Sequence, residues 1–204
     1  MELESARKNL VKISGHLYQQ GLVPGKSGNI SCKIGVENDF KVLITPSGVS
    51  LRDVDEKKVI IVDQEGKQLS GQGKPSSELK MHLNIYKKRD DVQGVVHTHS
   101  PYATGFSFSK ENISRMEGFG PVESPQIHVV EYAAPGTDEL AEIASRALEN
   151  DDVLILKDHG VLVVGKNLDD AALLAEFTES TAKTEFVARI ISREPIQVHL
   201  KRSR

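Results

Sequence analysis

Residues 95–99 read Val-Val-His-Thr-His and are followed directly by Ser100-Pro101. The β-branched start predicts a strand, and the Ser-Pro pair predicts that the strand ends there. Because strand side chains alternate between two faces, His97 and His99 leave the same face, about 6.6 Å apart along the backbone. Two imidazoles placed in this way can bind one metal ion at about 2.0–2.1 Å, the usual zinc–nitrogen distance. This stretch therefore predicts both a sheet and a candidate metal site.

The residues around this strand predict helices that enclose runs of strands. Apolar spacings of three and four predict the helices, and alternation or short apolar runs predict the strands. Runs of strands between helices favour a mixed or antiparallel sheet over a doubly wound βαβ fold. We therefore expect a three-layer α/β/α fold with a central mixed, largely antiparallel sheet, in one domain spanning residues 1–204. The expected helices lie near 3–20, 76–86, 137–148 and 168–191, the strands at 29–34, 40–44, 59–62, 127–130, 153–156 and 161–164, and a long loop at 106–126.

Composition excludes several classes of protein. The 204 residues are 38% hydrophobic and 27% charged, which is typical of a globular chain. A net charge of −3 gives no general attraction for nucleic acid or anionic lipid. The acidic start lacks a secretory signal, no apolar run approaches the roughly 20 residues of a membrane span, and Cys32 has no partner for an intramolecular disulfide. We therefore expect a soluble cytoplasmic protein without nucleic-acid or membrane partners.

A third histidine and a glutamate extend the candidate site. His159 lies in the Asp158-His159-Gly160 turn between two apolar strands, and three neutral imidazoles with an open fourth position are typical of catalytic zinc. A single histidine is more often a core or surface residue than a ligand, so spacing alone leaves both interpretations open. Glu78 stands near a predicted helix start, where it either complements the helix dipole or forms a metal-binding pair with His82, four residues on. For His82 we favour a supporting structural role.

Small residues in three predicted turns form a candidate anion site. Gly28-Asn29, Ser47-Gly48 and Ser76-Ser77 offer short side chains and accessible amides, and the last pair precedes a helix, whose N-terminus attracts anions. Ordinary turn and cap chemistry explains the same residues at least as well. Gly25-Lys26-Ser27 does not complete a phosphate loop, because the earlier glycine is misplaced and a strand follows instead of a helix.

These motifs stand in one order along nearly the whole chain, and together they resemble the class II aldolase family, which includes fuculose-1-phosphate aldolase and adducin-type domains. The resemblance implies that His97, His99 and His159 bind one Zn²⁺ per chain together with Glu78, and that Glu78 is also the catalytic carboxylate. It also implies an α/β/α fold and a ring-shaped homotetramer with active sites between neighbouring subunits. The implied pocket for the substrate phosphate consists of Gly28, Asn29, Ser47, Gly48, Ser76 and Ser77. The motifs that carry the resemblance are Gly28-Asn29-Ile30-Ser31, Thr45-Pro46-Ser47-Gly48, Ser76-Ser77-Glu78, His97-Thr98-His99 and Asp158-His159-Gly160.

Two features depart from the family pattern. Fuculose-phosphate aldolases of this family use a tyrosine of the adjacent subunit as a proton donor near the aldehyde, in the stretch that matches Asn112 to Ser124, and this stretch contains no tyrosine here. Phe119 cannot donate a proton, and Tyr132 is a weak substitute. The chain also ends soon after Pro195, where the family has a mobile tail. We therefore expect strict recognition at the phosphate and metal end of the substrate and lax recognition of the aldehyde.

Three functions are consistent with these residues. The leading hypothesis is a lyase, a zinc-dependent aldolase that reversibly cleaves a ketose 1-phosphate to dihydroxyacetone phosphate and a short aldehyde such as lactaldehyde. A second hypothesis keeps zinc and phosphate but dehydrates methylthioribulose 1-phosphate or epimerises a pentulose phosphate. A third is a metal-free, adducin-like binding module, which the retention of three histidines and Glu78 disfavours.

Overall fold

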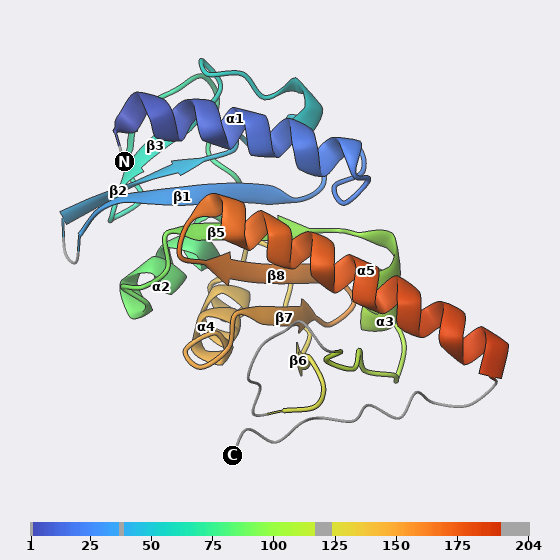
Figure 1. The fold of residues 1–204 in the computed structure, drawn as a ribbon. Helices are drawn as coiled ribbons and strands as arrows, with labels where there is room; N and C mark the ends of the chain where they lie inside the picture. The colour runs from blue at the N-terminus through green and yellow to red at the C-terminus, as the bar shows by residue number, and fades with distance from the viewer. Residues whose placement is uncertain (1, 37–38, 117–123, 193–204) are drawn as a thin grey trace.

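The computed structural model describes residues 2–36, 39–116 and 124–192, and one eight-stranded sheet forms its centre (Figure 1). The strands follow the order β4-β3-β2-β1-β5-β8-β7-β6, and every neighbouring pair is antiparallel except β6 with β7. The sheet is therefore mixed and largely antiparallel, as the sequence predicts. The strands are β1 (Asn29–Val36), β2 (Asp39–Ile44), β3 (Ile60–Asp63), β4 (Gln68–Ser70), β5 (Gly94–Thr98), β6 (His128–Val130), β7 (Val153–Leu156) and β8 (Gly160–Gly165).

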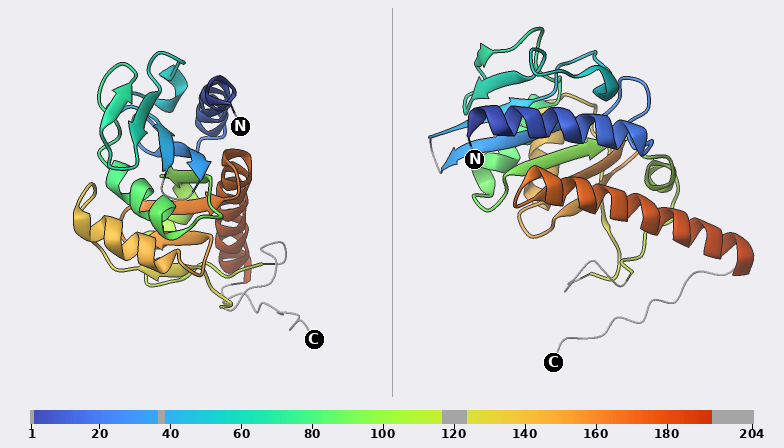
Figure 2. Two further views of the ribbon diagram at one scale, coloured as in Figure 1. Left: turned by 90° about the vertical axis from the view of Figure 1, so that its left-hand side faces the viewer. Right: turned by 45° about the horizontal axis from the view of Figure 1, so that its top comes forward.

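Helices cover both faces of this sheet. The long α1 and α5 lie on one face together with the short α3, and α2 and α4 lie on the other (Figure 2). The predicted three-layer α/β/α arrangement is confirmed. Within the described ranges, no helix combines the length and apolar character that a membrane span requires. The helices are α1 (Leu3–Gln19), α2 (Leu79–Lys88), α3 (Pro101–Ser107), α4 (Asp138–Ala147) and α5 (Leu168–Ser192), with a 3-10 turn at Leu51–Asp53.

The central strands are buried on both faces, so the hydrophobic core has two layers. In β5, Val96 faces the layer beneath α1 and α5, whereas its neighbour Val95 faces the layer beneath α2 and α4. Leu10 of α1 and Ala175 of α5 fill the first layer, and Tyr86 of α2 belongs to the second. Because packing holds β5 from both sides, the end of this strand is a rigid support for functional side chains.

Three elements differ from the sequence-based expectation. The helix α3 begins at Pro101, where we expected only the end of a strand; proline suits the first helical position because its missing N–H needs no partner there. The helix α2 begins at Leu79 rather than near Ser76, with Glu78 as its N-cap residue. The preceding Ser76 N–H donates to Thr45 O at 3.1 Å, which holds this segment beside the end of β2. The edge strand β4 is exposed throughout, so it carries no apolar pattern to predict it.

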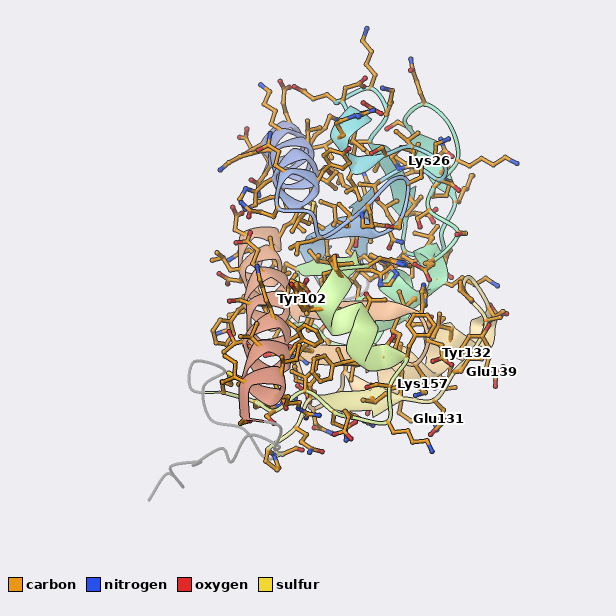
Figure 3. The ribbon with its side chains drawn as sticks, turned by 90° about the vertical axis from the view of Figure 1, so that its right-hand side faces the viewer. Lys26, Tyr102, Glu131, Tyr132, Glu139 and Lys157 are labelled. Atoms are coloured by element: carbon orange, nitrogen blue, oxygen red, sulfur yellow. The ribbon has the colours of Figure 1, made fainter. Side chains whose placement is uncertain are left out.

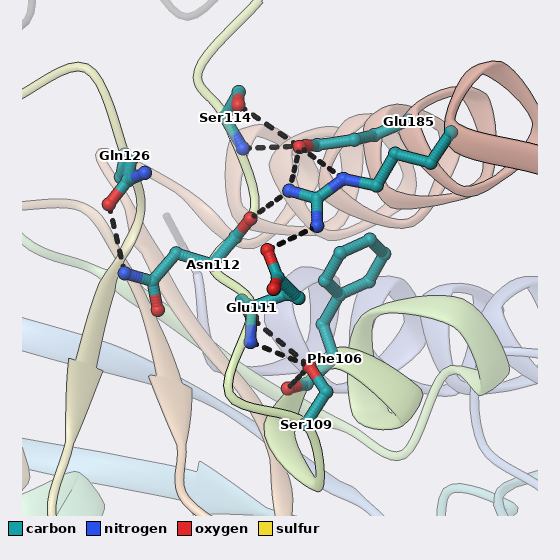
Figure 4. A network of polar contacts seen from close by, with 8 residues as sticks. Phe106, Ser109, Glu111, Asn112, Ser114, Gln126 and Glu185 are labelled. Atoms are coloured by element: carbon teal, nitrogen blue, oxygen red, sulfur yellow. Dashed lines mark hydrogen bonds and ion pairs between the residues drawn. The ribbon is translucent and has the colours of Figure 1, made fainter. Parts of the chain in front are cut away.

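A buried glutamate fastens the segment after α3 to α5 (Figure 4). Glu185 is fully buried and accepts hydrogen bonds from the backbone N–H of Ser114 at 2.7 Å and from its hydroxyl at 3.1 Å. Arg189, one turn further along α5, pairs with Glu185 and with Glu111. Part of the expected 106–126 loop is therefore bound to the helical layer, while 117–123 lie outside the described residues.

Two glycine substitutions should change stability in opposite directions. A Cβ at Gly94, the first residue of β5, would lie 2.5 Å from Asn167 O and 2.6 Å from Leu168 Cα. Because backbone atoms cannot move aside easily, we expect Gly94→Ala to lower the free energy of unfolding by about 1–3 kcal/mol. Gly15 in α1 has nothing within 4 Å of its Cβ position, so Gly15→Ala should raise it by about 0.5–1 kcal/mol. Urea unfolding measures both changes. An unchanged free energy of unfolding in Gly94→Ala would contradict the close approach of Asn167 and Leu168 to Gly94.

Candidate metal centre and active site

His97 lies near the end of β5, between β1 and β8. Its backbone position pairs with Asn29 on one side and with Leu162 on the other. The buried ring places Nδ1 2.9 Å from Val161 O, so the Nδ1–H donates to that carbonyl. This hydrogen bond fixes the tautomer and leaves the Nε2 lone pair available to a cation.

Three histidine rings meet at this point. The ring centroids of His97, His99 and His159 lie between 4.7 and 5.0 Å apart. One ligand nitrogen from each ring lies within 4.8 Å of the other two, and among the described residues these side chains form a group that could hold a metal ion. The structure thus brings together the three histidines that the sequence singles out, although β5 ends at Thr98 and His99 is the first residue after the strand.

The turn that carries His159 fits closely against β5. Asp158 adopts a left-handed backbone conformation with φ 54°, which asparagine and aspartate tolerate better than most residues. At Gly160, a Cβ would lie 2.4 Å from Thr98 O and 3.2 Å from His97 Cε1. The start of β8 therefore approaches β5 only because position 160 has no side chain, and this approach delivers His159 to the cluster.

The three nitrogens fit a divalent metal ion. His97 Nε2 and His99 Nε2 lie 3.0 Å apart, close to the separation of about 3.3 Å between two ligands of a tetrahedral zinc ion. Burial and the neighbouring imidazoles lower the pKa of His99 to about 3, and the same causes lower the pKa of His159 to about 4, so both rings are neutral. Facing lone pairs repel one another unless a cation or a shared proton lies between them. In addition, buried His159 Nδ1 has no hydrogen-bond partner within the described part of the chain.

The Glu78 carboxylate lies next to the His97 and His159 rings of this cluster. Its Oε2 lies 3.3 Å from His97 Nε2, and its Oε1 lies 3.6 Å from His159 Nε2. Oε2 accepts a hydrogen bond from Asn29 Nδ2 at 2.8 Å, whereas the buried Oε1 has no hydrogen-bond partner among the described residues. Burial alone would raise the pKa of Glu78, but His97 and the Asn29 hydrogen bond outweigh it and the pKa lies below its ordinary value. The site therefore offers an ionised carboxylate oxygen directed at the histidines.

The three predicted anion-binding turns lie against one another. Thr45 links them, because its carbonyl accepts the Ser76 N–H at 3.1 Å and its hydroxyl accepts the Ile30 N–H at 3.2 Å. The Ser47 N–H in turn donates to Lys74 O at 2.9 Å. Segments far apart in the sequence thus form one continuous surface beside the metal cluster.

Four of the six expected phosphate-binding residues are accessible on this surface. Ser47, Gly48 and Ser77 are exposed, and Gly28 is partly buried with a left-handed φ of 73°. A Cβ at Gly28 would lie 2.8 Å from His97 O, so only glycine brings this turn so near the metal cluster. The accessible amides and hydroxyls suit an anion, and their part in phosphate binding stays a prediction.

The other two expected phosphate-binding residues have internal partners. The Asn29 side chain donates to Glu78 and accepts from His82 Nε2 at 2.6 Å. The Ser76 hydroxyl accepts the Glu78 N–H at 3.3 Å, which starts α2. His82 also binds the Ser31 hydroxyl through Nδ1 at 2.6 Å, so both of its ring nitrogens are occupied and it stands apart from the metal cluster. This placement agrees with the supporting structural role that we favoured.

Of the residues considered for the aldehyde end, only Tyr132 lies in the described part of the chain. Tyr132 is 56% exposed and lies at the molecular surface (Figure 3). Phe119 and the segment after Ser192 lie outside the described residues.

Sequence reasoning missed Ser31 and Tyr86, which lie behind Glu78. The signal was available in the spacing, because Glu78, His82 and Tyr86 follow one another at intervals of four on one helical face. Ser31 stands two residues after Asn29 and so faces the same side of β1.

Comparison with known proteins decides the family. Residues 8–186 match the family model described as the Class II Aldolase and Adducin N-terminal domain. The chain belongs to the class II aldolase family. The resemblance read from the motifs is confirmed, and the protein is a lyase of this metal-dependent family.

Similar proteins differ in the reactions that their names describe. An L-fuculose phosphate aldolase of Methanococcus vannielii is 39% identical over 180 residues, which cover 88% of this chain and 95% of that protein. A 3-oxo-tetronate 4-phosphate decarboxylase of Haemophilus influenzae is 35% identical, with 89% of this chain and 87% of that protein covered. Among solved structures, an L-fuculose 1-phosphate aldolase matches with a TM-score of 0.85 and 31% identity, covering 98% of this chain and 92% of that one.

The purified enzyme should contain one divalent metal ion per chain. We expect His97→Ala and His159→Ala to lose it, because each change removes an imidazole from the cluster. His128→Ala is the matched control, since His128 is an exposed residue of β6 outside the cluster. Elemental analysis after dialysis measures the content, and equal metal in all four proteins would place the metal elsewhere.

Proposed function

We propose that this class II aldolase is zinc-dependent and reversibly cleaves a ketose 1-phosphate, similar to fuculose 1-phosphate, to dihydroxyacetone phosphate and a short aldehyde such as lactaldehyde. One observation carries the proposal: a buried carboxylate directs an oxygen, which has no hydrogen-bond partner among the described residues, at three converging imidazoles. In the proposal, His97, His99 and His159 hold the metal ion and Glu78 moves the proton.

The reaction needs a cation near the substrate oxygens and a base near the reacting carbon. Cleavage leaves an electron pair on the three-carbon phosphate, delocalised onto its oxygens; a zinc ion supplies the Lewis acid that stabilises such charge. Glu78 then delivers a proton to the hydroxymethyl carbon and removes it in the condensation direction. The Asn29 hydrogen bond at Oε2 fixes the carboxylate orientation, so Oε1 is the oxygen that exchanges the proton.

In the proposal, the turns beside the cluster bind the phosphate group of the substrate. Exposed Ser47, Gly48 and Ser77 lie at the rim of the site, and Ser77 also precedes α2. Backbone N–H groups at a helix start and short hydroxyl side chains are suited to bind phosphate oxygens. A phosphate held there fixes the three-carbon unit relative to Glu78, which lowers the entropic barrier to proton transfer.

A second candidate is the decarboxylation of a phosphorylated 3-oxo acid. Residues 112–124, the stretch in which the resemblance expects the tyrosine proton donor, contain no tyrosine. Loss of CO₂ from a 3-oxo-tetronate 4-phosphate breaks a carbon–carbon bond, leaves the same electron pair and gives dihydroxyacetone phosphate after protonation. It requires no aldehyde subsite, and the relative from Haemophilus influenzae bears the name of this reaction.

The proposal also includes a cytoplasmic homotetramer. The outer end of α5 supports an assembly, because Phe186, Ile190 and Ile191 are exposed large apolar residues. Tyr102 and Phe106 of α3 line a mostly apolar hollow of about 470 Å³ beside them. Contact between subunits would remove these exposed apolar side chains from water, and exposed apolar patches of this kind are typical of protein–protein interfaces.

Product analysis separates the two reactions and tests Glu78. With ketose 1-phosphates we expect dihydroxyacetone phosphate and an equal amount of aldehyde, whereas release of CO₂ from the 3-oxo acid would support the second candidate.

Glu78→Gln keeps the size and removes the base, so turnover should fall by about 10²-fold or more. Elemental analysis should find its metal content unchanged. Loss of the metal would identify Glu78 as a necessary ligand instead, and near-normal turnover would exclude it as the base.

Recognition should depend strongly on the phosphate. In the condensation direction, dihydroxyacetone phosphate should react with several short aldehydes, and unphosphorylated dihydroxyacetone should fail because the polar pocket would be left unpaired. Ser77→Ala should raise the KM for dihydroxyacetone phosphate while leaving the aldehyde preference unchanged. Steady-state kinetics with both substrates checks this, and efficient use of dihydroxyacetone would rule out the assigned phosphate pocket.

A further inference from the structure

A continuous chain of buried polar side chains runs from α2 and β1 to the back of Glu78. Tyr86 OH lies 2.8 Å from Ser31 Oγ, and Ser31 Oγ lies 2.6 Å from His82 Nδ1. His82 Nε2 lies 2.6 Å from Asn29 Oδ1, and Asn29 Nδ2 lies 2.8 Å from Glu78 Oε2. All five residues are buried, and Tyr86, Ser31 and His82 are fully so.

The carboxylate determines the direction of every hydrogen bond in this chain. Ionised Glu78 only accepts, so Asn29 must present its NH₂ group to it and its carbonyl oxygen to His82. That oxygen requires a proton on His82 Nε2, which leaves Nδ1 as an acceptor for the Ser31 hydroxyl. Ser31 then uses its one proton on His82 and accepts from Tyr86. Every donor in the chain therefore points toward Glu78.

Burial keeps the chain in this one protonation state. It lowers the pKa of His82 to about 3, so the ring is neutral, and it raises the pKa of Tyr86, so the phenol retains its proton. A neutral imidazole has one N–H and one acceptor nitrogen. His82 therefore donates to Asn29 through Nε2 and can only accept the Ser31 hydroxyl at Nδ1.

We infer that His82, oriented by Ser31 and Tyr86, is a positioning residue that fixes the Asn29 amide, and through it the orientation of the Glu78 carboxylate. The inference rests on the proposed role of Glu78. The alternative is a structural link between α2 and β1. A link alone does not explain the arrangement, because five polar groups placed next to an apolar layer are costly unless each is satisfied. Here Tyr86, Ser31, His82 and Asn29 all have hydrogen-bond partners, and the chain ends at a carboxylate whose Oε1 has none among the described residues.

The experiment compares variants that keep the chain with variants that interrupt it. His82→Gln keeps one amide donor for Asn29 and one acceptor for Ser31, whereas His82→Leu removes both. Ser31→Ala interrupts the chain without changing His82. Its matched control is Ser14→Ala, which removes another fully buried hydroxyl, one that donates to Leu10 O at 2.8 Å within α1.

The readout is the exchange of the hydroxymethyl proton of dihydroxyacetone phosphate with deuterated solvent, followed by NMR. This half-reaction needs the base and the three-carbon phosphate but no aldehyde. We expect His82→Leu and Ser31→Ala to lower its kcat by about 10–100-fold with little change in KM, metal content or overall fold. His82→Gln should stay within about threefold of the unaltered protein, because it restores the donor and the acceptor. Ser14→Ala should lower only the melting temperature.

Crystal structures of His82→Leu and His82→Gln give a readout independent of activity. Glu78 should lose its orientation toward the histidines in the first and keep it in the second. The inference is overturned if Ser31→Ala and His82→Leu behave as Ser14→Ala does, or if Glu78 is unmoved in His82→Leu. If the unaltered protein fails to exchange the proton while Glu78 still turns away in His82→Leu, the proposed function fails and the positioning role stands.

Discussion

The pairing of β5 with β1 and β8 is the constraint on which the site depends. It sets Asn29 beside His97 on one side and gives the His97 ring the Val161 carbonyl on the other. The two glycines that allow the neighbouring turns to approach, Gly28 and Gly160, both lie against backbone atoms of this strand. The position of His97 is therefore a property of the sheet, whereas His99 follows the end of β5 and His159 precedes the start of β8.

The cluster concentrates unsatisfied electrostatic interactions in a small space. Imidazole nitrogens face one another, and a carboxylate oxygen faces them without a hydrogen-bond partner in the described chain. Such an arrangement is unfavourable by itself and becomes favourable with one cation at its centre. The cost of holding the groups together is met by the hydrophobic layers on either face of the sheet, so the ligands are oriented before a metal ion arrives.

Sequence patterns predict those parts of the molecule that local rules determine. Strand alternation is sufficient to place His97 and His99 on one face, and runs of strands between helices are sufficient to predict the three layers. Local rules predict less of the structure where tertiary contacts determine it. The start of α2 depends on the hydrogen bond between Ser76 and Thr45, which the local pattern does not encode. The hydrogen bonds from Asn29 to Glu78 and His82 are not predictable locally, because cross-strand and helix contacts meet at that residue, and its part in phosphate binding stays a prediction.

The site draws its residues from positions between 28 and 159, which has a consequence for the order of assembly. Glu78 meets His159 only after β1, β5 and β8 have paired, and contacts of such separation form late because their loop-closure entropy must be overcome first. The two core layers pack apolar side chains and need no ion to do so, so the chain can complete its core before it acquires the ion. Metal loading is then a step of maturation, and chelation should leave a folded, inactive protein that recovers when the ion is returned.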